Sequence, residues 1–154
     1  MGKSYSGYKN RCGFACLAVL VSFFGMMAAS ATSLATTPQI SAGSRHTVAL
    51  KSDGTVWAWG YNIYGQCGTP NDYAKNGENT PVKVSNLSNV TAVAGGGYHS
   101  LAMKSDGTVW AWGGSDYYGQ LGNGTTVSSP TPVQVGSLSS VTAIAGGMDH
   151  SLAL

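Results

Sequence analysis

The sequence predicts an all-β protein. Three observations support this: a tandem repeat of about 50 residues, short strands of alternating polarity inside each repeat, and a composition rich in glycine but poor in charge. The 154 residues include 22 Gly, about twice the ordinary share, and charged residues make up 9%, far below the usual quarter. Hydrophobic residues make up 43%, which is atypical of a disordered chain. We therefore expect a folded domain of strands and tight turns.

Residues 1–35 have the three parts of a secretory signal peptide. A basic start precedes an uncharged apolar run at residues 12–31, and small-residue cleavage motifs end at Ala31 and Ala35. We expect cleavage after Ala35 and a secreted chain, periplasmic or extracellular. The alternative is an uncleaved segment that anchors the chain in a membrane, because the apolar run approaches the ~20 residues that span a bilayer.

The rest of the chain, residues 36–154, has no basic cluster. It carries five basic and six acidic residues, a net charge of −1, and the basic ones are scattered. Nucleic-acid binding requires clustered Lys and Arg, so we expect no nucleic-acid partner. Cys67 is the only cysteine left after cleavage, which excludes an internal disulfide. It occupies the repeat position of Leu121, so we expect a small buried apolar side chain.

An internal repeat organises these residues. The ten residues KSDGTVWAWG occur at 51–60 and again, unchanged, 53 positions later at 104–113. The preceding HTVAL, which starts at His46, becomes HSLAM at His99 and HSLAL at His150. The period defines three repeats, at about 40–92, about 93–143 and, truncated, about 144–154.

Each repeat predicts four short strands. In the first, Thr47–Leu50 and Thr55–Trp59 flank an Asp-Gly hairpin turn. A third strand opens at Pro81, where the missing N–H is harmless, and Val90–Ala94 forms a fourth. Four strands in about 50 residues is the size of one β-propeller blade. The sequence therefore predicts a partial β-propeller, with two full four-stranded blades and the start of a third.

The pattern H-[ST]-x-A-[LM]-K-S-D-G-T-V-W-A-W-G, followed by Y-G-Q-[CL]-G, closely resembles the regulator of chromosome condensation repeat family. The resemblance covers residues 39–154 and implies propeller blades, seven of them in the family's complete domains. This chain stops inside the third repeat, which would leave apolar faces and a strand edge without neighbours. We expect further repeats of the same protein to complete the ring; the alternative is self-assembly of several chains.

The repeated histidines and tryptophans are expected to be scaffold. A histidine at the start of each inner strand can link two blades by hydrogen bonding, whereas metal ligands must lie within ~2 Å of one ion. The tryptophans are expected to pack between blades. These scaffold positions are His46, His99, His150, Trp57, Trp59, Trp110 and Trp112. No nucleophile–base pattern or phosphate-binding loop is present, so we expect no catalytic residue, no cofactor and no metal.

Loop positions that differ between the repeats are the candidates for partner binding, because the scaffold does not constrain them. They precede each histidine, follow each Trp-Ala-Trp-Gly, or lie in the loop before Pro81. The candidates are Arg45, Tyr61, Asn62, Tyr73, Lys75, Tyr98, Asp116, Tyr117 and Asp149. Tyrosine and asparagine on rigid loops are typical of protein-binding surfaces. The alternative is that these loops simply tolerate change.

These observations predict an exported, non-enzymatic scaffold that binds another protein through its blade loops. The alternative, motivated by the loop tyrosines, is a module that binds carbohydrate or a cell surface. The resemblance also implies guanine-nucleotide exchange on a small GTPase, the activity of the family's eponymous members. Export would separate this chain from such GTPases, so this function is the least favoured. Secreted bacterial propellers of the family that bind and inhibit enzymes fit the expected compartment better.

Overall fold

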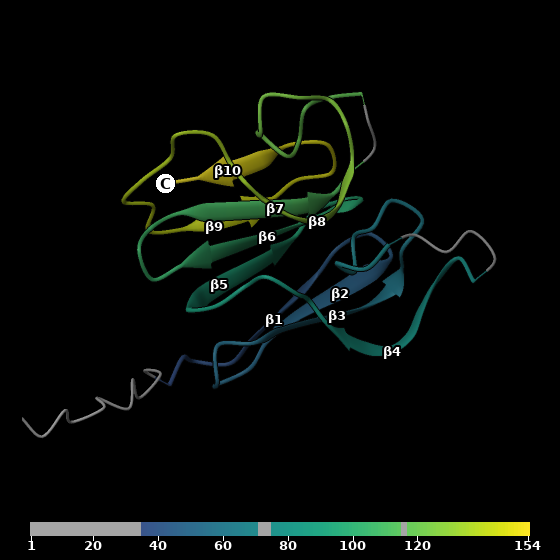
Figure 1. Cartoon of the computed structure of the whole chain (residues 1–154), viewed down its shortest axis with the longest axis horizontal. Helices are drawn as coiled ribbons and strands as arrows, with labels where there is room; N and C mark the ends of the chain where they lie inside the picture. Colours follow the sequence, from purple (N-terminus) through teal and green to yellow (C-terminus); the bar gives the residue numbers. More distant parts are fainter. Residues whose placement is uncertain (1–34, 71–74, 115–116) are drawn as a thin grey trace, which may run out of the picture. The chain divides into compact units, whose positions relative to one another are not determined.

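The computed structural model describes residues 35–70, 75–114 and 117–154 (Figure 1). The expected signal peptide lies outside the described residues except for Ala35, and so does the alternative membrane anchor. The candidate residues Tyr73 and Asp116 also lie outside them. The described residues form ten β-strands, and no helix among them is long and apolar enough to cross a membrane.

The strands form three antiparallel sheets, two of four strands and one of two (Figure 1). The first sheet contains β1 (Gln39–Ala42), β2 (His46–Leu50), β3 (Val56–Tyr61) and β4 (Gly77–Lys83), in that order. The second contains β5 (Val90–Gly95), β6 (His99–Lys104), β7 (Val109–Gly113) and β8 (Ser129–Gln134). The third contains β9 (Ile144–Gly146) and β10 (Ser151–Ala153). The architecture confirms the expected all-β partial propeller.

The expected grouping of the strands is wrong at one position. Residues 90–94 were expected to close the first blade, but β5 pairs with β6 and begins the second sheet. The fourth strand of the first sheet is β1, which pairs with β2. The connection between β4 and β5 explains the difference, because Asn86 and Asn89 have φ of 60° and 56° and turn the chain out of the first sheet.

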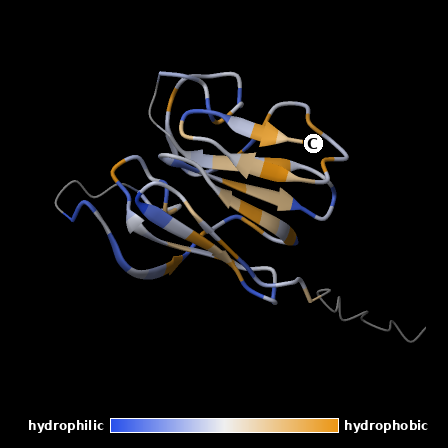
Figure 2. Cartoon of the chain, turned by 180° about the vertical axis from the view of Figure 1, so that it is seen from behind, coloured by the Kyte–Doolittle hydropathy of each residue, from blue (hydrophilic) through white to orange (hydrophobic). Residues whose placement is uncertain are grey.

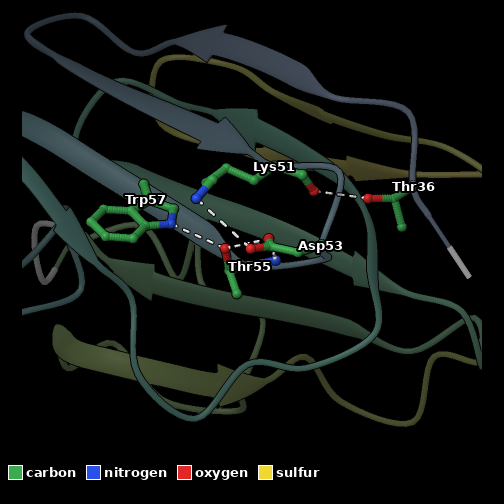
Figure 3. A network of polar contacts seen from close by, with 5 residues as sticks. All are labelled: Thr36, Lys51, Asp53, Thr55 and Trp57. Atoms are coloured by element: carbon green, nitrogen blue, oxygen red, sulfur yellow. Dashed lines mark hydrogen bonds and ion pairs between the residues drawn. The ribbon is translucent and has the colours of Figure 1, made fainter. Parts of the chain in front are cut away.

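The Asp-Gly hairpin turn is held by a chain of side-chain hydrogen bonds (Figure 3). The Asp53 carboxylate accepts from the Thr55 backbone N–H (3.0 Å) and hydroxyl (2.6 Å), and Trp57 Nε1 donates to Thr55 Oγ1 (3.0 Å). The Thr55 bonds lower the pKa of Asp53. Lys51 Nζ lies 5.3 Å from the Trp57 ring centroid. The second repeat has the same contacts, so the identical decapeptide builds the same turn twice.

Two apolar clusters lie between neighbouring sheets. The first combines Val48 and Val56 of the first sheet with Ala102 and Trp112 of the second. The second combines Leu101 and other residues of the second sheet with β9 of the third. Figure 2 shows hydrophobic residues along the strands, including β10 beside the C-terminus. Neighbouring sheets therefore pack face to face through apolar residues, as blades of a propeller do.

Candidate functional site

The contact between the first and second sheets, which we call the first joint, contains a buried polar link. His46 Nε2 lies 2.9 Å from Ser100 Oγ, and this hydroxyl donates to the Gln66 carbonyl at 2.8 Å. Because the hydroxyl proton goes to the carbonyl, the imidazole must donate through Nε2. Trp112 Nε1 donates to the same carbonyl at 3.0 Å. The link joins both sheets and fixes the loop that contains Gln66.

The contact between the second and third sheets, the second joint, repeats the polar link. His99 Nε2 lies 3.0 Å from Ser151 Oγ, which donates to the Gln120 carbonyl at 2.6 Å. His150, the third histidine of the series, is exposed. We expected these histidines to link neighbouring blades, and two of them do so. The structure describes no third sheet-to-sheet contact in which His150 could take part.

The linked histidines are neutral parts of the scaffold. Each imidazole ring packs against the backbone of the glycine three positions earlier in the sequence. A Cβ added at Gly43 would lie 2.1 Å from His46 Cε1, so the ring takes the space of a side chain there. Burial lowers the pKa of His46 to about 4, with a further contribution from His99, whose own pKa burial also lowers. Within the described part of the chain, no three His, Cys, Asp or Glu side chains gather to hold a metal ion.

The tryptophans differ in their burial. Trp112 is 0% exposed and fills the first joint. Trp57 and Trp59 alternate along β3 with Val56 and Ala58, which face the second sheet, so both tryptophans face away from it. They are half-buried, as is Trp110. Packing between sheets is therefore seen for Trp112, whereas Trp57 and Trp59 lie on a face that no described sheet covers.

Three tyrosines gather at one end of the first joint. Tyr61 ends β3, Tyr64 lies in the loop after β3, and Tyr98 immediately precedes β6; their ring centroids are 5.3–6.4 Å apart. We call these three residues the tyrosine cluster. The exposed Arg45 has its guanidinium carbon 5.8 Å from the Tyr61 ring centroid. The structure thus brings together three of the sequence candidates, Arg45, Tyr61 and Tyr98, and adds Tyr64.

The backbone holds the tyrosine cluster in place. The Tyr61 N–H donates to the Arg45 carbonyl at 2.8 Å, and the Tyr98 carbonyl accepts from the Gly114 N–H at 2.7 Å. The Tyr64 N–H donates to the Gln66 side chain at 3.0 Å. The rings are half-buried. The cluster is therefore an aromatic surface with an adjacent positive charge on a rigid support.

Asn62 does not belong to this surface, and its assignment as a partner-binding residue is wrong. The residue is only 3% exposed to solvent. Its Oδ1 accepts from the Cys67 N–H at 2.8 Å, and its Nδ2 donates to Thr69 Oγ1 at 2.9 Å. Asn62 therefore holds its own loop closed. Cys67 is buried, as expected from its repeat position, and burial raises the pKa of its thiol to about 12.

The remaining candidates lie apart from the tyrosine cluster. Tyr117 is 81% exposed and lies beside Tyr118, which is 69% exposed. Asp149 is half-buried on the turn before His150, and Lys75 is exposed at the start of the described loop before β4. The second joint therefore carries an acidic residue where the first joint carries Tyr98.

The sequence matches one repeat family twice. The family model described as the regulator of chromosome condensation (RCC1) repeat matches residues 53–103 and 106–154. A second model of this repeat matches residues 39–66 and 90–120. The unit 53–103 runs from the turn before β3 into β6, so the sequence repeat spans two sheets.

Two curated proteins illustrate the similarity in sequence. The chain is 37% identical over 119 residues to E3 ubiquitin-protein ligase HERC2 of Homo sapiens and 38% identical over 108 residues to protein pim1 of Schizosaccharomyces pombe. The matches cover 75% and 62% of this chain, but only 2% and 20% of those relatives. The chain therefore spans a small part of each relative.

Solved structures show the same fold. Prp20p of Saccharomyces cerevisiae aligns with a TM-score of 0.67 at 21% identity, covering 77% of this chain and 31% of that one. Yeast RCC1 (Prp20) bound to Kap60 aligns at 0.64 and 26% identity, covering 75% and 29%. Human WBSCR16 aligns at 0.65 and 24% identity, covering 77% and 31%.

Proposed function

Since the chain belongs to the regulator of chromosome condensation (RCC1) repeat family, we propose that it is a scaffold that binds another protein through one end of its sheets. One neighbour in structure, yeast Prp20p, has protein partners: binding to Gsp1p and histones is described for it, and it was also solved bound to Kap60. These partners belong to that protein, and the partner of this chain is a separate question.

The tyrosine cluster with Arg45 is the observation that carries this proposal. Tyrosine and arginine are enriched at the centres of protein interfaces: tyrosine provides large contact area at low entropic cost, and arginine provides directed hydrogen bonds. The cluster takes residues from two sheets, so its shape depends on the intact first joint. A partner with an apolar side chain for the rings and a carboxylate for Arg45 would complement this surface.

We also propose that the chain is exported and that binding involves no catalysis. Residues 1–35 have the pattern of a signal peptide, and the sequence contains no nucleophile–base arrangement. The measurement for export is the mass of the chain recovered outside the cell. A mass equal to residues 36–154 supports cleavage, whereas a full-length chain retained in the membrane contradicts it.

Carbohydrate binding is the second candidate function. The adjacent Tyr117 and Tyr118 favour it, because they expose aromatic rings on which a sugar could stack. It differs from the first candidate in its location, since these tyrosines do not belong to the tyrosine cluster. A variant in each region therefore separates the two functions.

The test is affinity capture with the full chain as bait. We compare the wild type with the variants Tyr98→Ala and Tyr117→Ala, each checked by circular dichroism to be folded at the assay temperature. Under the proposal, Tyr98→Ala loses a captured protein by about tenfold or more, and Tyr117→Ala retains it. A glycan array is probed with the same three proteins. Glycan binding that only Tyr117→Ala abolishes, without a protein partner, would establish the second function instead.

A further inference from the structure

Three equivalent turns of the sheets carry side chains of different charge. The turns join β1 to β2, β5 to β6 and β9 to β10. The residue directly before the histidine is Arg45 in the first turn, Tyr98 in the second and Asp149 in the third. We call these three residues the turn row. Because the turns are equivalent by repeat, the row presents a positive, an aromatic and a negative group at the same end of three successive sheets.

Backbone hydrogen bonds fix the spacing of the turn row. The Ser44 N–H donates to the Gly96 carbonyl at 3.3 Å, which joins the first turn to the second. The Gly97 N–H donates to the carbonyls of Gly147 (3.0 Å) and Met148 (3.1 Å), which joins the second turn to the third. Glycine allows this close approach, because a Cβ added at Gly97 would lie 2.3 Å from the Met148 carbonyl oxygen. The three side chains are therefore held on one rigid backbone support.

The two charges of the turn row are unpaired. In the described part of the chain, neither Arg45 nor Asp149 lies within ion-pair distance of an opposite charge, and the ion pair found there joins Lys51 to Asp53. Arg45 is exposed beside the Tyr61 ring, and Asp149 is half-buried. Because the backbone holds the two charges on separate turns, they do not neutralise each other. Each charge is therefore available to an opposite charge on a partner.

We propose that the turn row selects an extended segment of the partner that carries a carboxylate, a large apolar or aromatic side chain and a cation, in that order in either chain direction. The carboxylate pairs with Arg45, the apolar side chain packs on the tyrosine cluster beside Tyr98, and the cation pairs with Asp149. This inference rests on the proposed function and adds the charge pattern of the bound segment. An extended chain advances about 3.3 Å per residue, so successive side chains can reach successive turns.

The rings and the charges have different roles in this recognition. The tyrosine cluster provides the contact area for affinity. Exposed charges add little affinity, but a like charge placed against them is strongly disfavoured. A segment with two carboxylates would bring one of them against Asp149, and a segment with two cations would bring one of them against Arg45. The turn row therefore discriminates against both kinds of singly charged segment.

The test uses the full chain and three classes of synthetic peptide with capped, uncharged ends. Each peptide has a central Trp, flanked by one Glu and one Lys, by two Glu or by two Lys. One to three Gly separate the Trp from each charge, so that no spacing is assumed. NMR chemical-shift titration measures the affinities. We expect the wild type to bind the best mixed peptide about fivefold more tightly than the best peptide of either like-charged class.

Charge reversal provides the sharpest comparison. Arg45→Glu makes both ends of the row negative and should bind the peptides with two Lys most tightly. Asp149→Lys makes both ends positive and should prefer the peptides with two Glu. The double variant keeps the net charge of the wild type and one charge of each sign, so it should again prefer the mixed peptides.

Lys83→Glu is the matched control for the change in net charge. It changes the net charge as much as Arg45→Glu does, but the exposed Lys83 lies opposite Trp57, away from the end of β3 that carries Tyr61. This control should keep the preference of the wild type for mixed peptides. Circular dichroism establishes that every variant is folded.

The failure of this inference differs from the failure of the proposed function. Equal binding of the three peptide classes, no binding of any, or a wild type that prefers two Glu would overturn the inference, because Asp149 would then take no part. The proposed function keeps its own test, the loss of a captured protein in Tyr98→Ala.

A second copy of the chain is the competing occupant, since its own turn row carries both charges. Sedimentation equilibrium of the full chain and the variants distinguishes it. Dimers that Arg45→Glu dissociates, and that the double variant with Asp149→Lys restores, would show that two copies pair through their turn rows. That result would overturn the proposed partner segment, whereas a monomer that binds the mixed peptides supports it.

Discussion

The two joints share a polar link and differ in what surrounds it. Both place a histidine against a serine hydroxyl, which donates to a glutamine carbonyl. In the first joint the link is enclosed by Trp112, which is fully buried. In the second joint a cavity of about 390 Å³ lies in the place of that tryptophan. The two described strands of the third sheet are therefore enough to form the polar link, whereas the tryptophan that encloses the first link belongs to the third strand of its sheet.

This difference shows where the described sheets gain their stability. A buried hydrogen bond contributes about 1 kcal/mol net, whereas a buried tryptophan contributes several kcal/mol through the area it removes from water. The polar link fixes the register between the sheets, and the tryptophan holds them together. The first joint should therefore be much stronger than the second, and the following predictions test this order.

The largest expected effect comes from Trp112→Ala. Removing this fully buried side chain leaves a cavity in the first joint and the Gln66 carbonyl without one of its donors, so we expect a loss of about 3–5 kcal/mol in the free energy of unfolding. The matched variant is Trp59→Ala, at the same repeat position but half-buried. It should lose about half as much or less. Urea unfolding measures the free energy of unfolding of both variants. Equal losses would contradict the difference between Trp112, which a neighbouring sheet covers, and Trp59, on a face that no described sheet covers.

The next effect is a loss of stability in acid through His46. Burial lowers its pKa in the folded chain from 6.5 to about 4, so between these pH values the unfolded chain binds a proton that the folded chain does not. Stability from this group is therefore complete above pH 6.5 and falls by up to about 3 kcal/mol as the pH drops to about 4.

The variant His46→Gln isolates this contribution. Glutamine has no titrating group, so the decrease in the free energy of unfolding between neutral and acid pH should be smaller than in the wild type. His99→Gln should act in the same direction, because burial also lowers the pKa of His99. If wild type and His46→Gln lose stability equally over this range, His46 is not held neutral by burial.

A smaller loss of stability is expected when the serine of either polar link is replaced, and we expect this loss to differ between the two joints. Ser100→Ala leaves the buried His46 Nε2 without its partner, and we expect a loss of about 1–3 kcal/mol. Ser151→Ala removes the same bond in the second joint, but Ser151 is half-buried and lies beside a cavity that water can enter. Its loss should be about 1 kcal/mol or less. Urea unfolding of the two variants under one condition provides the comparison.

The sequence was sufficient to predict an all-β chain of short repeated strands and the linking role that His46 and His99 take. The repeat places His46 and His99 at equivalent positions, and each has a following sheet beside it, so both take the same role. The period alone does not show where one sheet ends and the next begins. That boundary depends on the turn at Asn86 and Asn89, whose left-handed backbone conformation has no counterpart in the hydrophobic pattern.

The binding surface was harder to predict, and two residues show why. Asn62 was chosen because its position varies between the repeats, yet it is buried by bonds to its own loop. Tyr64 was passed over because Tyr118 repeats it, yet it joins the tyrosine cluster. The exposure of a loop residue depends on what the neighbouring sheet places beside it. A position-by-position comparison of the repeats does not show which residues of the neighbouring sheet lie beside a loop side chain.

Tyr64 and Tyr118 provide the smallest and most specific comparison. Both occupy the same repeat position, but Tyr64 packs edge-on against Tyr98 at 5.3 Å, whereas Asp149 takes the place of Tyr98 in the second joint and Tyr118 is 69% exposed. An aromatic pair contributes about 0.5–1.5 kcal/mol beyond its buried area. Tyr64→Ala should therefore lose about 1 kcal/mol or slightly more, and Tyr118→Ala should remain within about 0.5 kcal/mol of the wild type. A double-mutant cycle with Tyr98→Ala measures the coupling directly, and a coupling near zero would mean that the cluster is assembled by the backbone rather than by contacts between its rings.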